Sequence, residues 1–223
     1  MSILSETTCR FYPIKRSGYI ILDKISTMKI FLDVGAHIGE TLEVVLDKKY
    51  GFDKIYCFEP ATVCCDIIKA KFQDPRVVVC EYGLWNSGCI MPLYNPGDMG
   101  ASVFKDKPNR HHTGSLNTKF ISASNWFSQH LNFNDQVFVK INCEGSECVI
   151  LDDLIDSGQY KKINVLMVDF DVRKIPSQKH LAEEMKAKLS KLDIPKIFYA
   201  EDFNFGKGAH KIFTDNWLDL SNG

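Results

Sequence analysis

Residues 30–41 have the sequence Ile30-Phe31-Leu32-Asp33-Val34-Gly35-Ala36-His37-Ile38-Gly39-Glu40-Thr41, and Ile55-Tyr56-Cys57-Phe58-Glu59-Pro60 follows about 20 positions later. Each stretch begins with a short apolar run, which is typical of a buried strand. The first run continues through a glycine-punctuated turn into a predicted helix over 40–48, whose first N–H groups would face a polar ligand group. Glu59, at the end of the second strand, would accept hydrogen bonds from both ribose hydroxyls. Together the two stretches predict a Rossmann-like nucleoside site.

The turn Asp33-x-Gly35-x-His37-x-Gly39 discriminates between nucleotides. The dinucleotide fingerprint needs a glycine where His37 stands, because glycine lets the backbone approach a pyrophosphate. Asp33 would repel phosphate, whereas it would attract the ammonium and sulfonium groups of S-adenosylmethionine. We therefore favour S-adenosylmethionine over NAD as the cofactor, and a structural loop without any ligand is the remaining alternative.

Composition is consistent with one α/β domain. The chain has 223 residues, of which 45% are hydrophobic, so it can bury a substantial core. A formal net charge of −1 provides no basic field for nucleic acid. The apolar runs are too short to cross a bilayer and no signal-peptide pattern is present, so the default expectation is a cytoplasmic protein. The eight cysteines include no Cys-x-x-Cys pair and the histidines show no zinc spacing, so we expect no structural metal.

Apolar runs and helical periodicity alternate regularly after residue 28. Strands separated by helices imply a mostly parallel sheet covered on both faces. We expect strands over 29–34, 54–59, 76–81, 136–142 and 163–170, and helices over 40–48, 61–72, 124–131, 147–157 and 180–192. Lys196 to Asp202 and His210 to Asp215, joined by Gly206-Lys207-Gly208, predict a closing antiparallel hairpin. Residues 1–28 would form an arm or cap before a single catalytic domain over 29–223.

A long stretch from Trp85 to Lys119 lacks a regular pattern, and its part over 95–119 is rich in glycine, proline and polar residues. Long loops of this kind often act as lids or recognition elements. The sequence therefore predicts a substrate loop over 95–119, in which Arg110, His111 and His112 would face the acceptor. An exposed, solvated loop is the alternative.

The predicted strand over 136–142 carries a signature. Residues 137–147 have the sequence Val137-Phe138-Val139-Lys140-Ile141-Asn142-Cys143-Glu144-Gly145-Ser146-Glu147, which resembles the Lys-Ile-Asp-x-Glu-Gly-x-Glu signature of FkbM-type methyltransferases. Together with the Asp-x-Gly-Ala turn and Phe58-Glu59-Pro60, this makes a three-part match over roughly residues 30–170. The resemblance implies a class I (Rossmann-like) methyltransferase fold, with a seven-stranded, mostly parallel sheet, helices on both faces and the hairpin at one edge. It also implies S-adenosylmethionine-dependent O-methylation, often of sugars or other hydroxylated metabolites.

The chain departs from the family pattern in three places. His37 replaces the usual Asn of the first turn. Asn142 replaces the usual Asp, which removes a charge that could orient the methionine ammonium or help to hold a metal. Asp169 and Asp171 stand where many relatives have Glu and His, and their carboxylates could point into the cleft. Because the Asp is missing at position 142, a divalent metal is possible but not expected.

Residue roles follow from the strand ends and from the resemblance. A sugar hydroxyl is a weak acid, so a positioned proton acceptor is needed, and the candidates are Glu144, Lys140, His37, His111 and His112. Lys140 would need burial to lower its pKa, and a packed or ion-paired lysine is the alternative. Trp85 would flank adenine or belong to the core. The residues expected to bind the cofactor are Asp33, Gly35, Ala36, His37, Gly39, Thr41, Glu59, Pro60, Gly83, Leu84, Trp85, Ser102 and Asn142.

Three classes of function are compatible with these observations. We favour an O-methyltransferase that acts on a hydroxyl of a sugar, glycan or similar metabolite. A methyltransferase acting on protein or nucleic acid is disfavoured by the near-neutral charge and by the absence of an Asp/Asn-Pro-Pro-Tyr motif. A non-catalytic module that only binds the cofactor is supported by Asn142 and by the altered strand end at Asp169 and Asp171. The sequence does not predict an oligomeric state.

Overall fold

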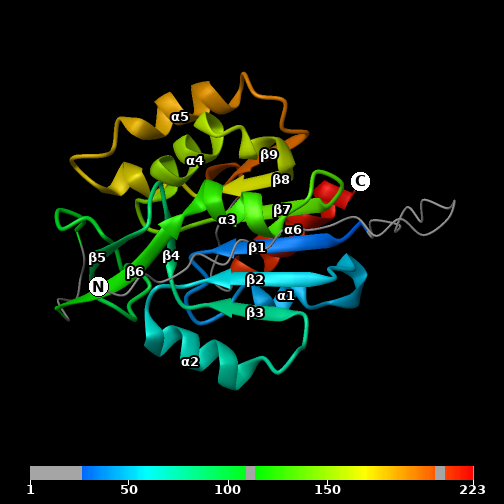
Figure 1. The fold of residues 1–223 in the computed structure, drawn as a ribbon, viewed down its shortest axis with the longest axis horizontal. Coiled ribbons are helices and arrows are strands. Elements are labelled where there is room, and N and C mark those ends of the chain that lie inside the picture. The colour runs from blue at the N-terminus through cyan, green and yellow to red at the C-terminus, as the bar shows by residue number, and fades with distance from the viewer. Residues whose placement is uncertain (1–26, 109–113, 204–208, 223) are drawn as a thin grey trace, which may run out of the picture.

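The computed structural model describes residues 27–108, 114–203 and 209–222. Within these residues, six parallel strands form the central sheet in the order β3-β2-β1-β7-β8-β9 (Figure 1). Their bounds are β1 Lys29–Val34, β2 Lys54–Phe58, β3 Val77–Cys80, β7 Gln136–Ile141, β8 Ile163–Val168 and β9 Lys196–Tyr199. The order of the strands along the chain reverses between β1 and β7, and open α/β sheets bind ligands outside the carboxyl ends of the strands at such a point.

The strands are apolar because the sheet is covered on both sides. Leu32 of β1 is fully buried and lies opposite Tyr56 of β2 and Val139 of β7. Strands buried on both faces are expected to be continuously apolar rather than alternating. The five strands predicted over 29–170 are confirmed, with ends that agree within two residues.

Helices cover both faces of this sheet. Helices α3, α4 and α5 pack on one face, where they contribute Trp126, Leu151 and Met185 to the core. Val44 and Trp217 bring α1 and α6 onto the other face, where α2 also contributes a core residue. The helices are α1 Leu42–Val45, α2 Thr62–Lys71, α3 Ala123–His130, α4 Glu147–Asp156, α5 Leu181–Leu189 and α6 Ala209–Asn222, with 3-10 turns η1 Lys48–Tyr50, η2 Gln159–Lys162, η3 Asp171–Lys174 and η4 Ala200–Asp202. No helix of the described residues is long and apolar enough to span a bilayer.

The region from Trp85 to Lys119 is more regular than its sequence indicates. It contains β5 Cys89–Tyr94 and the first part of β6 Ser115–Ser122, which pair antiparallel and form a small sheet with β4 Gly83–Trp85. The sequence of β6 shows no clear alternation of apolar and polar residues, because two of its buried positions, Thr118 and Ser122, are polar. Pro92 lies in β5, at the edge of this sheet, which is where a strand tolerates proline.

The predicted C-terminal hairpin is wrong. β9 pairs parallel with β8, and the segment predicted as a returning strand over 210–215 lies in helix α6. Thr214, Trp217, Leu218 and Ser221 are buried at a spacing of three and four residues, so one face of a helix packs on the sheet. The described sheet therefore has six strands instead of seven. The predicted turn over 206–208 lies outside the described residues, as does nearly all of the predicted arm, and the domain bounds stay a prediction.

Candidate functional site

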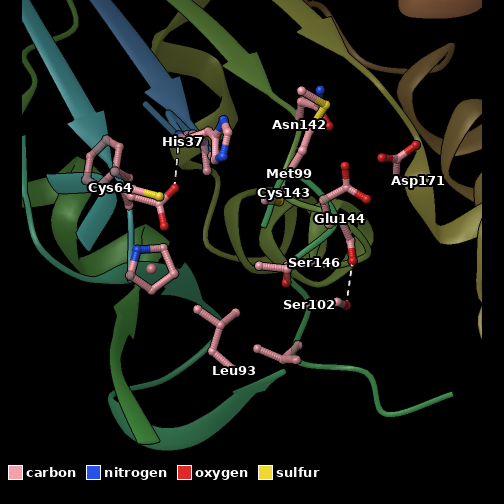
Figure 2. Close-up of a pocket in the computed structure, with 18 of the residues that line it drawn as sticks. His37, Cys64, Leu93, Met99, Ser102, Asn142, Cys143, Glu144, Ser146 and Asp171 are labelled. Atoms are coloured by element: carbon pink, nitrogen blue, oxygen red, sulfur yellow. Dashed lines mark hydrogen bonds between the residues drawn. The ribbon is translucent and has the colours of Figure 1, made fainter. Parts of the chain in front are cut away.

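A cavity of about 370 Å³ opens at the carboxyl ends of β1, β2, β7 and β8 (Figure 2). This volume lies within the range of small-molecule sites. Figure 2 shows His37 and Cys64 on one side of the cavity and Asn142, Glu144 and Asp171 on the other. Its residues at the strand ends form two walls. The β1–β2 wall consists of Gly35, His37, Glu59 and Pro60, and the β7–β8 wall consists of Asn142, Glu144, Asp169 and Asp171.

Glu59 is the centre of the β1–β2 wall. Its Oε2 accepts the backbone N–H of His37 at 2.9 Å and its Oε1 accepts that of Ala61 at 2.8 Å. Each oxygen keeps further acceptor capacity, because a carboxylate oxygen has two lone pairs. The residue is only 7% exposed, and burial raises the pKa of its carboxyl to about 7. Glu59 is thus a rigid acceptor at the end of β2, as the sequence predicts.

The backbone N–H groups of the turn after β1 donate within the protein rather than toward the cavity. The N–H groups of Gly35 and Ala36 both donate to the carbonyl of Phe58, at 3.0 and 3.1 Å. The following helix α1 has only four residues. The helix predicted over 40–48 is therefore shorter than expected, and the N–H of Leu42 at its start donates to the carbonyl of Gly39 at 3.0 Å. The turn approaches β7 instead, since a Cβ on Gly35 would lie 1.9 Å from the carbonyl oxygen of Asn142.

The His37 side chain belongs to the cavity and is held by a neighbouring acid. Its Nδ1 lies 2.8 Å from Glu40 Oε1, and this hydrogen bond raises the pKa of the imidazole. The backbone of Gly97, in the loop after β5, also hydrogen-bonds the imidazole. His37 has a left-handed φ of 48°, which is uncommon for a residue other than glycine. The side chain thereby connects the β1 turn with the loop that covers the cavity.

Asp33 and Lys140 form a buried ion pair between the two central strands. Lys140 Nζ donates to Asp33 Oδ1 at 2.7 Å and lies 3.4 Å from the carbonyl oxygen of Gly35. Asp33 is fully buried and does not line the cavity, so the expectation that its charge would attract a cationic cofactor is not supported. Lys140 does line the cavity, and the ion-paired alternative describes its state.

Glu144 projects from the β7–β8 wall. It has a left-handed φ of 57°, and its backbone carbonyl accepts the Ser102 hydroxyl at 2.6 Å. Lys107 Nζ forms an ion pair with Glu144 Oε2 and donates to the carbonyl of Gly100 at 3.0 Å. Burial, followed by the charge of Asp171, raises the pKa of the Glu144 carboxyl to about 7. A carboxyl group with this pKa can accept a proton at neutral pH.

Two acids after β8 complete this wall. Asp171 is 1% exposed and forms an ion pair with Lys174, with Nζ 2.5 Å from Oδ1. Its Oδ2 is buried and accepts no hydrogen bond from any described residue. Asp169 accepts Arg173 Nη1 at 3.0 Å, and burial raises its pKa. The side-chain oxygen of Asn142 is likewise buried without a partner among the described residues.

The structure brings ten of the predicted site residues to the cavity. These are Gly35, His37, Glu59, Pro60, Gly83, Leu84, Ser102, Lys140, Asn142 and Glu144. Five others lie behind its surface or away from it: Asp33, Ala36, Gly39, Thr41 and Trp85. Ala36 and Thr41 are buried, Gly39 lies against Phe72, and Trp85 packs on Phe104 and Phe120. His111 and His112 lie outside the described residues, and their role stays a prediction.

No sequence pattern predicts which basic residues pair with the acids of the β7–β8 wall. Lys107 precedes Glu144 by 37 positions, and no pattern connects the two. Glu147 could have been found, since it ends the signature of β7. It is fully buried, and its Oε1 accepts the N–H groups of Cys143 at 3.1 Å and Gly145 at 3.0 Å. Burial raises the pKa of Glu147 to about 8, and its role is to hold the turn that presents Glu144.

The residues of the cavity fit S-adenosylmethionine better than a dinucleotide. Six lining residues are acidic and two are lysines: Glu40, Glu59, Asp98, Glu144, Asp169 and Asp171, against Lys140 and Lys174. The acids of the β7–β8 wall each have a basic partner, so the excess of carboxylates lies on the β1–β2 side, where it disfavours a pyrophosphate and suits a sulfonium and an ammonium. The side-chain oxygen of Asn142, which has no partner among the described residues, can accept a hydrogen bond from an ammonium. Phe58 and Leu84 provide apolar surface. No group of three or more His, Cys, Asp or Glu in the described part of the chain could hold a metal ion.

Comparisons with known proteins yield one structure. No family model matches the chain, and no curated protein matches it. The crystal structure of methyltransferase FkbM from Methylobacillus flagellatus KT is similar, with 17% identity and a TM-score of 0.38 over 62% of this chain and 32% of that chain. This chain spans about a third of the length of that protein.

Proposed function

We propose that this protein is an S-adenosylmethionine-dependent methyltransferase that transfers a methyl group to a hydroxyl of a sugar, glycan or similar metabolite. The observation that carries the proposal is Glu59, whose two oxygens are each anchored by a backbone N–H at the rim of an acidic cavity. A carboxylate in this place, at the end of the second strand, is suited to bind ribose hydroxyls.

The β1–β2 wall and its apolar neighbours would hold the cofactor. Glu59 would accept the ribose hydroxyls, Leu84 and Phe58 would contact the adenine, and Asn142 would accept the methionine ammonium. When bound, S-adenosylmethionine supplies a methyl group that is already activated by its sulfonium. The protein then has to align an oxygen nucleophile with this methyl group and to take its proton.

The β7–β8 wall would hold the acceptor. Each of its acids has a basic partner: Lys107 for Glu144, Arg173 for Asp169 and Lys174 for Asp171. The wall is therefore close to electrically balanced, which suits a neutral, hydroxylated acceptor better than a strongly charged one. Glu144 is the proton acceptor in this proposal, because its pKa of about 7 leaves it partly ionised at neutral pH.

Calorimetric titration tests the proposal. Wild type should bind S-adenosylmethionine and not NAD, and Glu59→Ala should weaken binding at least about tenfold because a buried hydrogen-bond acceptor is lost. Glu81→Ala is the matched control, since Glu81 is an exposed acid that pairs with Lys69 on the surface. Binding should also weaken as the pH falls below about 7, where Glu59 becomes protonated. Binding of neither ligand, or of NAD alone, would contradict the proposal.

A cofactor-binding module without turnover is the second candidate. It is favoured by Asn142, an uncharged residue where the resembled signature has Asp. Incubation with methyl-labelled S-adenosylmethionine and a panel of methyl glycosides and oligosaccharides separates the two candidates. Label transfer supports the methyltransferase, whereas tight cofactor binding with no transfer to any member of the panel favours the module.

A further inference from the structure

We propose that Lys107 is a positioning residue, which holds the covering loop (residues 95–107) closed on the cavity only while the Glu144 carboxyl group is ionised. The proton that Glu144 takes from the acceptor then releases the loop and opens the cavity. The charge-dependent tie between the loop and Glu144 rests on the geometry of the structure, whereas its use in a reaction rests on the proposed function.

The covering loop forms one side of the cavity. Six of its residues line the cavity: Gly97, Asp98, Met99, Ala101, Ser102 and Val103. Tyr94 and Ser102 exchange two backbone hydrogen bonds, of 2.8 and 3.1 Å, at the base of the loop. The N–H of Ala101 donates to the carbonyl of Asp98 at 3.0 Å near its tip. Because these bonds do not involve the β7–β8 wall, the tip can keep its shape when the contacts with that wall are lost.

Three polar contacts of the described residues tie the covering loop to the far side of the cavity. The Ser102 hydroxyl donates to the backbone carbonyl of Glu144 at 2.6 Å (Figure 2). Asp106 Oδ2 accepts the N–H of Ser177, in the segment after β8, at 3.0 Å. Lys107 Nζ forms an ion pair with Glu144 Oε2. Of these three contacts, the ion pair is the one that changes when the Glu144 side chain gains a proton.

Lys107 depends on this carboxylate because its side chain is buried. The side chain is 3% exposed, and its Nζ also donates to the carbonyl of Gly100 at 3.0 Å. An ammonium has three N–H donors, and a buried charge that loses its counter-ion is strongly destabilised. When Glu144 is neutral, water can hydrate Lys107 only if the covering loop moves away from the wall. A neutral Glu144 therefore favours the open loop.

The other lysines of the cavity are paired with other acids, and Glu144 can change its charge near neutral pH. Lys140 and Lys174 line the cavity, and each forms an ion pair with an Asp. Burial and the charge of Asp171 raise the pKa of Glu144 to about 7, while Lys107 lowers it. The charged side chains described around Glu144 are Asp98 and Lys107 from the covering loop, Lys140 from β7, Glu147 from α4, and Asp169, Asp171, Arg173 and Lys174 from the segment after β8.

The proton that Glu144 receives connects the reaction with the loop. The proton of the acceptor hydroxyl forms a new O–H bond with a carboxylate oxygen of Glu144. The hydroxyl oxygen keeps the electron pair of its broken O–H bond and uses it for the new bond to the methyl carbon, while the electron pair of the methyl–sulfur bond stays with sulfur. Lys107 then lacks a counter-ion, the loop opens and the methylated product leaves. Water that enters takes the proton from Glu144, and the restored ion pair closes the loop.

Amide hydrogen exchange of the ligand-free protein tests the tie. The N–H of Ser177 donates to Asp106 of the covering loop, so its exchange rate reports on the opening of the loop. Glu144→Gln removes the charge and keeps the shape of the side chain. At a pH of about 8, where Glu144 of the wild type is ionised, this variant should accelerate the exchange of Ser177 at least about tenfold, because Lys107 loses its counter-ion.

Two controls separate the ion pair from a general loss of packing. Asp169→Asn neutralises another acid of the same wall, which pairs with Arg173, and should leave the exchange of Ser177 as in wild type. In a Lys107→Met background, Glu144→Gln should have no further effect, because no ammonium is left to lose its partner. A role of Glu144 in packing alone gives the same acceleration in both backgrounds.

The pH dependence of the same exchange rate needs no variant. Because the pKa of Glu144 is about 7, the exchange rate of Ser177, relative to that of an unstructured peptide, should increase as the pH falls from about 8 to about 6. Lys107→Met should abolish this increase. Lys105→Met, at an exposed position of the same loop, should keep it.

Two results would overturn the tie. One is a relative exchange rate of Ser177 that is the same in wild type at both pH values. The other is an acceleration by Glu144→Gln that is equally large in the wild-type and the Lys107→Met backgrounds. Calorimetry with S-adenosylmethionine reports separately on the proposed function. Failure to bind the cofactor, together with a loop that opens as the pH falls, would refute the function and leave the tie in place.

Discussion

The two walls of the cavity are held in different ways. In the β1–β2 wall, Glu59 is fixed by the backbone N–H groups of Ala61 and His37, which come from its own strand end and from the neighbouring turn. In the β7–β8 wall, Glu144 and Asp171 are fixed by the side-chain charges of Lys107 and Lys174. Backbone donors do not titrate, whereas an array of carboxylates and lysines responds to pH and to single substitutions. The acid of the β1–β2 wall is thus held by donors that keep their protons, whereas the acids of the β7–β8 wall are held by charged side chains.

The largest effect is expected where the two walls are joined. Lys140→Met leaves Asp33 as an uncompensated buried charge between β1 and β7, so we expect a loss of about 3–5 kcal/mol of unfolding free energy. Urea denaturation measures this loss. The double variant Asp33→Leu/Lys140→Met should recover most of it, because no buried charge remains. A single variant as stable as the double one would show that the ion pair does not join the walls.

Gly35→Ala changes the contact between the turn after β1 and the end of β7 through the backbone. A Cβ at Gly35 would meet the carbonyl oxygen of Asn142 at 1.9 Å, and the φ of +84° is itself unfavourable for alanine. We expect a loss of about 3 kcal/mol in unfolding free energy. Gly51→Ala is the control, since Gly51 also has a positive φ but no atom within 4 Å of its Cβ position, and it should cost about 1 kcal/mol. Equal losses of unfolding free energy in the two variants would show that the contact with Asn142 does not destabilise Gly35→Ala.

The pH dependence of stability sharpens the description of the β7–β8 wall. The pKa of Glu147 rises from 4.5 to about 8 on folding, so the folded protein binds more protons than the unfolded chain between these pH values. Its contribution to stability is present at low pH and is lost as the pH rises through this window. In wild type, Glu147 should therefore lower the free energy of unfolding by about 1 kcal/mol for each pH unit in this window. Glu147→Gln should remove this part of the slope.

Denaturant titrations of wild type and Glu147→Gln at several pH values between 4.5 and 8 measure this difference. Glu81→Gln, at an exposed position, is the control and should have the same slope as wild type. Parallel curves for wild type and Glu147→Gln would mean that Glu147 does not hold its proton in the folded protein.

Ser102→Ala is expected to have the smallest effect. The Ser102 hydroxyl donates to the carbonyl of Glu144 and accepts the N–H of Phe104, so the variant loses two hydrogen bonds at a buried position. We expect a loss of about 1 kcal/mol of unfolding free energy. Ser87→Ala, at an exposed position, should change it by no more than a few tenths. An unchanged free energy in Ser102→Ala would show that the loop after β5 does not support the β7–β8 wall.

The β1–β2 wall was largely predictable, because its residues are close in sequence and its chemistry is local. Glu59 was expected at the end of a strand and lines the cavity. Asp33 was placed in the correct turn, but its direction was not predicted: a strand residue can face the ligand or the next strand, and here it pairs with Lys140. Gly35 and Ala36 were expected to surround the cofactor, and their direct use of the Phe58 carbonyl as hydrogen-bond acceptor was not predicted.

By itself, the sequence determined the parallel strands and the motif that ends them, since apolar runs, glycine turns and a terminal acid are local signals with known periods. Only the tertiary structure decided that the segment over 209–222 is a helix, because burial of Trp217 and Leu218 against the sheet selects that period. It also decided the partners of Glu144, which lie far away in the chain. Their effects on proton affinity depend on burial and on distance through space, and neither quantity exists until the chain is folded.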